Sequence, residues 1–126
     1  MIYNDEKIKI GLVEAIYNDC IDIKSIDNNK EIIFNFNKEN YNFNSLNIGQ
    51  TIDLKKYLCS DTTFKINQTS YLFYLPKASV FITKIDDNKF KLLVNITNPD
   101  IIYVYNPVEN ELFKDLKIDI EISFLL

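Results

Sequence analysis

The 126-residue chain carries 14 lysines against 18 acidic residues, a net charge of −4, and contains no histidine, arginine or tryptophan. The absence of histidine and arginine excludes Ser–His and Cys–His catalytic pairs, the usual zinc ligand sets and bidentate phosphate clamps. An acidic surface repels the phosphate backbone, so we expect no nucleic-acid binding.

The N-terminal residues 1–7 are polar and lack the apolar core of a secretion signal. No stretch of the chain approaches the run of about eighteen apolar residues that a membrane-spanning helix needs. We therefore expect a cytoplasmic protein with no membrane partner. In that compartment the two cysteines, Cys20 and Cys59, would stay reduced.

Apolar and polar residues alternate with a period of two along most of the chain, which predicts strands with one buried face. Residues 118, 120, 122 and 124 share the apolar face of the last strand, and residues 79–85 and 90–96 are apolar enough to be central strands. The expected strands include residues 7–10, 20–24, 31–37, 51–54, 71–74, 79–85, 90–96, 101–105 and 117–124. This spacing predicts one all-β domain over residues 1–126, an antiparallel sandwich or small barrel of about eight or nine short strands.

Turn residues separate these strands. Residues 27–30 and 86–89 are rich in Asp and Asn, which tolerate positive φ and favour hairpins, and Gly49 marks another reversal. Helix is expected to be scarce. Residues 14–18, 54–58 and 109–116 are candidates for single helical turns, and each of them can equally be a strand or loop.

Groups that could carry chemistry are few. Lysines near Cys59 can lower the pKa of its thiol, but a structural cysteine is the favoured interpretation. A carboxylate pair can hydrolyse glycosides, yet eighteen acids make some pair inevitable. Residues 27–29 and 86–88 offer calcium-type oxygens without the calcium-loop pattern, so we interpret them as turns. We expect no catalytic residue, metal or cofactor.

The remaining candidates form an interaction surface. Tyrosine has an apolar ring with a polar tip and suits an interface or the mouth of a ligand cavity, although packing within the sheet is the alternative. Acidic residues near the C-terminus form either a solvated strand face or a docking surface for a basic partner. The candidate residues are Tyr71, Tyr74, Tyr103, Tyr105, Glu109, Glu111, Asp115, Asp119 and Glu121.

These observations favour a non-enzymatic protein-binding module of bacterial type. Its sharpest form is an immunity or antitoxin-like protein that masks a basic partner. The alternatives are a small-ligand-binding β-barrel and a structural subunit of a larger assembly. A carboxylate-based hydrolase is the least favoured interpretation, because the side chains that most hydrolases use are missing.

Overall fold

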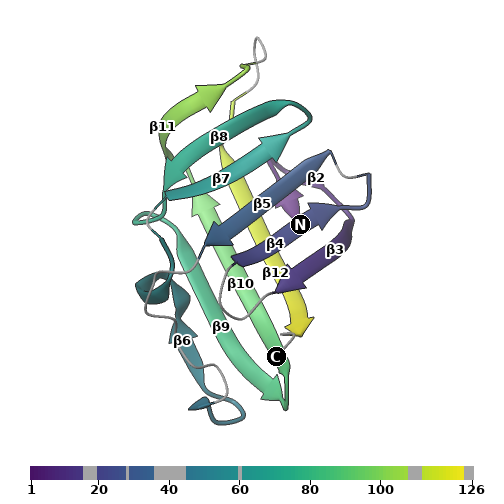
Figure 1. Cartoon of the computed structure of the whole chain (residues 1–126), viewed down its shortest axis with the longest axis vertical. Helices are drawn as coiled ribbons and strands as arrows, with labels where there is room; N and C mark the ends of the chain where they lie inside the picture. Colours follow the sequence, from purple (N-terminus) through teal and green to yellow (C-terminus); the bar gives the residue numbers. More distant parts are fainter. Residues whose placement is uncertain (16–19, 28, 36–44, 60, 108–111, 124–126) are drawn as a thin grey trace.

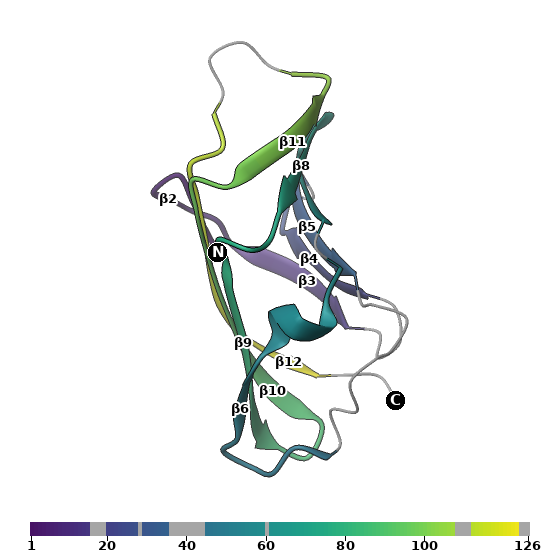
Figure 2. The same cartoon turned by 90° about the vertical axis from the view of Figure 1, so that its left-hand side faces the viewer.

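The computed structural model describes residues 1–15, 20–27, 29–35, 45–59, 61–107 and 112–123. Within these ranges the chain forms two antiparallel sheets of six strands each, which face one another as a sandwich (Figures 1 and 2). The strands of one sheet run across those of the other in Figure 1. The all-β prediction is confirmed, and the chain forms a sandwich instead of a closed barrel.

The spatial order of the strands differs from their order along the chain. Sheet A contains β2 (Glu6–Lys7), β1 (Ile2–Tyr3), β12 (Asp115–Ser123), β10 (Lys89–Thr97), β9 (Ser79–Asp86) and β6 (Thr51–Asp53). Sheet B contains β11 (Asp100–Tyr105), β8 (Thr69–Tyr74), β7 (Asp61–Ile66), β5 (Lys30–Asn35), β4 (Cys20–Ser25) and β3 (Ile10–Ala15). A short 3-10 helix, η2 (Leu54–Tyr57), follows β6.

The alternating sequence decides which face of each strand is buried. In β10 every second residue is buried, from Phe90 to Ile96, and the residues between them are exposed. The same alternation in β12 buries Leu116, Ile118 and Ile122. Both β9 and β10 have neighbours on two sides, as expected of central strands. Phe124, expected on the same face of the last strand, lies outside the described residues.

The described part of the chain has twelve strands, more than the eight or nine predicted. β1 and β2 contain two residues each, which is too short for an alternating pattern to show. The strand expected at residues 7–10 is divided between β2 and β3. Glu14, a candidate for a helical turn, lies in β3. β7 was not predicted, because the polar residue Thr62 lies on the buried face of this strand and interrupts the apolar pattern.

Asparagine occupies most of the positions with positive φ among the described residues. It accounts for five of the seven, namely Asn4, Asn67, Asn88, Asn98 and Asn106, and the other two are Asp5 and Gly49. Asn88 confirms the predicted turn between β9 and β10. The helical turn expected at residues 54–58 is η2, capped by the carboxylate of Asp53. Part of the third helical candidate, residues 109–111, lies outside the described residues, and Asp115 already belongs to β12.

Gly11 lets two chain segments approach closely. A Cβ atom at this position would lie 2.6 Å from Cα of Ile26. The amide of Ile26 donates a hydrogen bond of 2.8 Å to the carbonyl of Lys9, which holds the turn after β4 against the start of β3. The register of β3 and β4 shifts between Ile10 and Leu12, so Gly11 also occupies a β-bulge.

An aromatic cluster joins the two sheets at one end of the core. Phe113 lies just before β12 and is 4% exposed. Its ring centroid lies 5.0–5.7 Å from those of Phe64, Phe73, Tyr3 and Tyr71. Three of the four contacts are edge-to-face. This geometry is favourable for aromatic pairs, so Phe113 contributes strongly to core packing.

Candidate functional site

Three exposed tyrosines gather at one edge of sheet B. β11 is the last strand on this side and pairs with β8. Tyr103 lies opposite Leu72 of β8, and Tyr105 lies opposite Ser70. Tyr74 lies opposite Asp100 of β11. We define the tyrosine surface as Leu72, Tyr74, Tyr103 and Tyr105, which all point away from the core.

The tyrosines of the tyrosine surface are largely open to solvent. Tyr74 is 46% exposed, Tyr103 60% and Tyr105 62%. A β-bulge between Ile101 and Tyr103 leaves Ile102 without a cross-strand partner and 41% exposed. No residue of β11 is buried, although five of its six residues are apolar or aromatic.

Tyr71 does not belong to this surface, and its predicted surface position is wrong. It lies in the core, 4% exposed, opposite Phe64 of β7. Its ring contacts that of Phe113 edge-to-face at 5.7 Å. Tyr71 and Tyr74 are three positions apart in one strand, and residues separated by an odd number point to opposite faces. This parity in the sequence is the signal that could have excluded Tyr71.

The predicted acidic residues are not next to the tyrosines. Asp115, Asp119 and Glu121 lie on β12, on the outer face of sheet A, because their neighbours in the alternation point into the core. Glu109 and Glu111 lie outside the described residues. The tyrosine surface belongs to sheet B. The structure therefore divides the predicted surface between the two outer faces of the sandwich.

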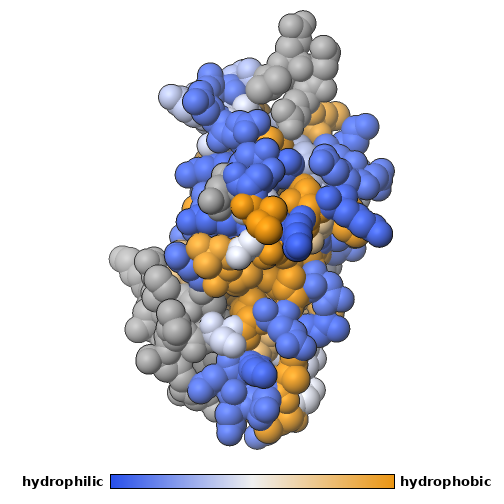
Figure 3. All heavy atoms as spheres, turned by 90° about the vertical axis from the view of Figure 1, so that its right-hand side faces the viewer, coloured by the Kyte–Doolittle hydropathy of each residue, from blue (hydrophilic) through white to orange (hydrophobic). Residues whose placement is uncertain are grey.

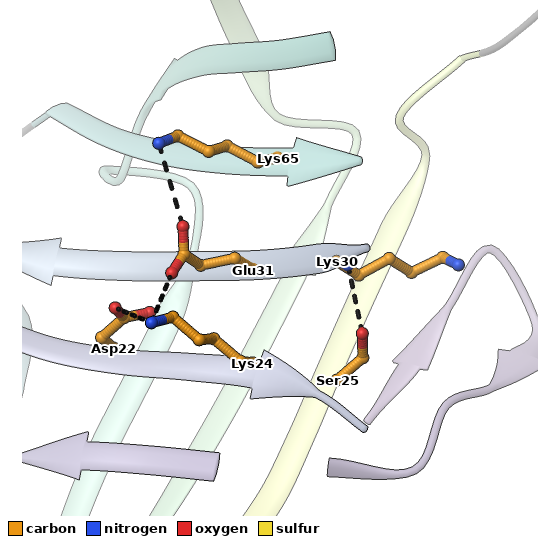
Figure 4. A network of polar contacts seen from close by, with 6 residues as sticks. All are labelled: Asp22, Lys24, Ser25, Lys30, Glu31 and Lys65. Carbon is orange, nitrogen blue, oxygen red and sulfur yellow. Dashed lines mark hydrogen bonds and ion pairs between the residues drawn. The ribbon is translucent and has the colours of Figure 1, made fainter. Parts of the chain in front are cut away.

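A row of charged side chains continues the outer face of sheet B away from the tyrosine surface (Figure 4). Lys65 of β7 lies between Ser70 of β8 and Glu31 of β5 in the strand register. Its Nζ is 3.8 Å from Oε1 of Glu31. Nζ of Lys24 is 3.5 Å from Oε2 of Glu31 and 3.5 Å from Oδ2 of Asp22. One ammonium group thus bridges two carboxylates.

The surroundings of Asp22 change its protonation. The pKa of Asp22 is raised to about 6, mainly by burial and further by the hydrogen bond and like charge of Glu31, while Lys24 lowers it. The carboxylate of Asp22 in turn raises the pKa of Lys24. No described residue bonds to Oδ1 of Asp22, which is buried. Asp22 is therefore a partly desolvated charge held by one lysine.

We expect Asp22→Asn to stabilise the protein at neutral pH. The folded-state pKa of about 6 lies above the ordinary 3.8, so between these two pH values the folded protein retains a proton that the unfolded chain has lost. The free energy of unfolding therefore falls as the pH rises from 3.8 to about 6. At pH 7 the variant should be more stable by about 1 kcal/mol, allowing for solvent screening, and near pH 3.5 the difference should vanish.

Urea denaturation across this pH range measures the effect of Asp22→Asn. Asp87→Asn, in the exposed turn between β9 and β10, is the control and should keep the wild-type pH profile. A variant of Asp22 whose profile is parallel to that of the wild type would contradict the assignment of the pH dependence to this carboxylate.

The other predicted candidates have structural explanations. Both cysteines are half-buried and free of disulfides. The carboxylate of Asp27 accepts hydrogen bonds from the hydroxyl of Ser25 and, at 3.2 Å, from the amide of Asn29. These bonds lower the pKa of Asp27 and are typical of a turn. In the described part of the chain, no three acidic or cysteine side chains lie close enough to hold a metal ion.

Comparison with known proteins finds no matching family model and no significant similarity to a curated protein or a solved structure. Among the described residues there is no helix with the length and apolar character to span a bilayer.

Proposed function

We propose that the protein is a non-enzymatic binding module that contacts a partner protein through the outer face of sheet B. The observation that carries the proposal is β11, a strand of mainly apolar and aromatic residues of which none is buried. A strand of this composition usually covers a core. Exposed aromatic and aliphatic side chains that gather in one place are typical of protein interfaces.

The outer face of sheet B combines two kinds of contact. The tyrosine surface offers large rings that lose little side-chain entropy on binding. The charged row next to it offers an electrostatic rim. Charged residues on this face of the sheet include four acids and two lysines, namely Glu14, Asp22, Glu31, Asp61, Lys24 and Lys65. The excess of acids favours a basic partner, in keeping with the net charge of −4.

An immunity or antitoxin role is the sharpest form of this proposal, with the tyrosine surface masking the active site of a basic toxin. Among the described residues no observation favours the alternative of a small-ligand-binding barrel, because the chain forms two separate sheets with packed aliphatic and aromatic side chains between them.

Affinity capture from a lysate of the source cell tests the proposal. The protein should retain one stoichiometric, basic partner whose binding weakens with salt. Replacing Tyr103 and Tyr105 together by serine should weaken this binding at least about tenfold, since exposed tyrosines at an interface are frequent hot spots. Isothermal titration with the purified partner gives the dissociation constants.

The control carries the same kind of change on the other sheet. Phe81 and Ile85 lie on the exposed side of β9 in sheet A, and are 39% and 38% exposed. Their joint replacement by serine should leave the affinity unchanged. Recovery of chaperones only, or a partner that the tyrosine variant retains at full affinity, would contradict the proposal.

A further inference from the structure

The described acidic residues of the predicted surface, Asp115, Asp119 and Glu121, lie on β12, a strand with an incomplete set of neighbours. β10 pairs with β12 over its whole length, from Asp115 to Ser123. On the other side, β1 pairs only with Leu116 and Lys117. Among the described residues, nothing pairs with this side of residues 118–123. In an antiparallel ladder every second residue directs its N–H and C=O to a given side, so about three residues present free backbone groups here.

The same side of the sandwich is apolar. β3, the edge strand of sheet B, lies beside β12. Figure 3 shows an apolar stripe down this side of the molecule. Leu12 of β3, 45% exposed, lies opposite Lys24 and so points to the outer face of sheet B. Ile10 and Val13 of the same strand pack against the core but are only partly buried. Between the two edges the core is therefore not fully covered.

The burial of β12 itself points to a missing neighbour. Ile118 and Ile122 are each 3% exposed, whereas Ile120, between them on the same face, is only half-buried. Where β1 stops, a hollow of about 450 Å³ opens on the outer face of sheet A, next to Ile2, Leu93 and Ile118. An extended segment that continued the line of β1 would cover Ile120 on one face and place side chains in this hollow on the other.

The charges at the open edge of β12 indicate which kind of segment can bind there. Asp119 and Glu121 are the charged residues on the outer face of the open stretch, and both are exposed. On the neighbouring strand β10, Lys91 lies opposite Glu121, and its Nζ is 3.5 Å from the carboxylate of Asp119. One lysine therefore lies near both acids. Residues opposite each other in an antiparallel pair share a face. A strand added at this edge would therefore be favoured by lysine or arginine opposite Asp119 and Glu121.

The same acids disfavour a second copy of this chain. Two β12 strands paired antiparallel about a twofold axis at Ile120 place Asp119 opposite Glu121 twice. An axis at Asp119 places Asp119 opposite its own copy, and an axis at Glu121 places Glu121 opposite its own copy. Like charges directly opposite each other destabilise a strand pair.

We propose that the open edge of β12 binds an extended basic segment of a partner protein as an added antiparallel strand. Alternate apolar residues of this segment cover Ile120 between the sheets, and its lysines or arginines meet Asp119 and Glu121. This binding by strand addition combines main-chain hydrogen bonds with side-chain selection. It does not depend on the tyrosine surface, which lies on the other outer face.

Two peptides test the proposal. One is an eight-residue, acetylated and amidated peptide that alternates valine with lysine, and the other has glutamate in place of lysine. The lysine peptide should bind at least about tenfold more tightly by fluorescence anisotropy, because its charges oppose those of the edge. Hydrogen exchange should show new protection of about three amides within residues 118–123.

Charge reversal locates the site. Asp119→Lys with Glu121→Lys should reverse the preference between the two peptides. Asp86→Lys with Asp87→Lys makes the same change in net charge at the exposed end of the hairpin formed by β9 and β10, and should leave the preference unchanged. The Tyr103→Ser, Tyr105→Ser variant should bind the lysine peptide like the wild type, which separates this site from the tyrosine surface.

Several results would overturn the proposal. They are equal binding of the two peptides, no binding of the lysine peptide at about 1 mM, protection in β11 instead of β12, or no effect of charge reversal on β12. A homodimer with the same amides protected without peptide would assign the edge to a second copy. Sedimentation of the free protein detects such a dimer.

Discussion

Replacing Phe113 by alanine is expected to lower the free energy of unfolding by about 3–5 kcal/mol, the largest effect of any single substitution considered for this protein. The side chain is 4% exposed and contacts four aromatic rings. Its loss leaves a cavity between Tyr3 of sheet A and Phe64 and Phe73 of sheet B. These rings are held by separate sheets, so they cannot easily move to fill the space.

Two controls separate packing from local backbone effects. Leu112, the preceding residue, is 64% exposed, and Leu112→Ala should change stability by less than about 0.5 kcal/mol. Phe113→Leu keeps most of the apolar volume and should cost about 1–2 kcal/mol. Urea denaturation measures all three variants. If Phe113→Ala costs no more than Leu112→Ala, the aromatic cluster does not hold the sheets together.

Asn4→Ala is expected to cost about 2–3 kcal/mol, a large effect for a residue in a surface turn. Oδ1 of Asn4 accepts hydrogen bonds of 2.9 Å from the amides of Lys114 and Asp115, and Nδ2 donates one of 2.6 Å to the carbonyl of Leu112. Its φ of 47° also lies in the left-handed region, which alanine tolerates less well. The side chain thus fastens the turn after β1 to the segment that carries Phe113.

The two contributions of Asn4 can be measured separately. Asn4→Gly accepts positive φ and loses only the side-chain bonds. Asn98→Ala is the matched control, because Asn98 has a similar φ of 43° and, among the described residues, makes only a backbone hydrogen bond, from its amide to the carbonyl of Lys114. It should cost about 1 kcal/mol. Equal losses for Asn4→Ala and Asn98→Ala would show that the side-chain bonds of Asn4 do not stabilise the fold.

Neither Asn4 nor Phe113 is identifiable from the sequence. Asn4 is one of many asparagines in a polar stretch, and its partners at residues 112–115 are more than a hundred positions away. Phe113 lies in a segment whose pattern fits a helical turn, a strand or a loop. Their importance comes from contacts between the two ends of the chain, which no local pattern encodes.

The candidate site was predicted in part. Alternation places Tyr103 and Tyr105 on one face of a strand, and both are exposed in the structure. Tyr71 was placed on the surface wrongly, although its odd separation from Tyr74 already put the two on opposite faces. The charged row from Asp22 to Lys65 was missed, because its four residues come from three strands and meet only through strand pairing.

The sequence by itself determined the class of fold and the buried face of most strands. The alternation along β10 and β12 is local, so it needs no knowledge of the neighbouring strands. The amino-acid composition also excluded chemistry that depends on histidine, since a side chain absent from the sequence is absent in any fold.

Only the tertiary structure decided which strands are neighbours and which surfaces lie together. β1 and β12, from opposite ends of the chain, pair over two residues. Where that pairing stops, the open edge of β12 begins. Strand pairing is selected by packing between residues far apart in sequence, and the pattern within one strand does not contain that information. For this reason the exposed tyrosines and the described acids, predicted as one surface, lie on opposite faces of the sandwich.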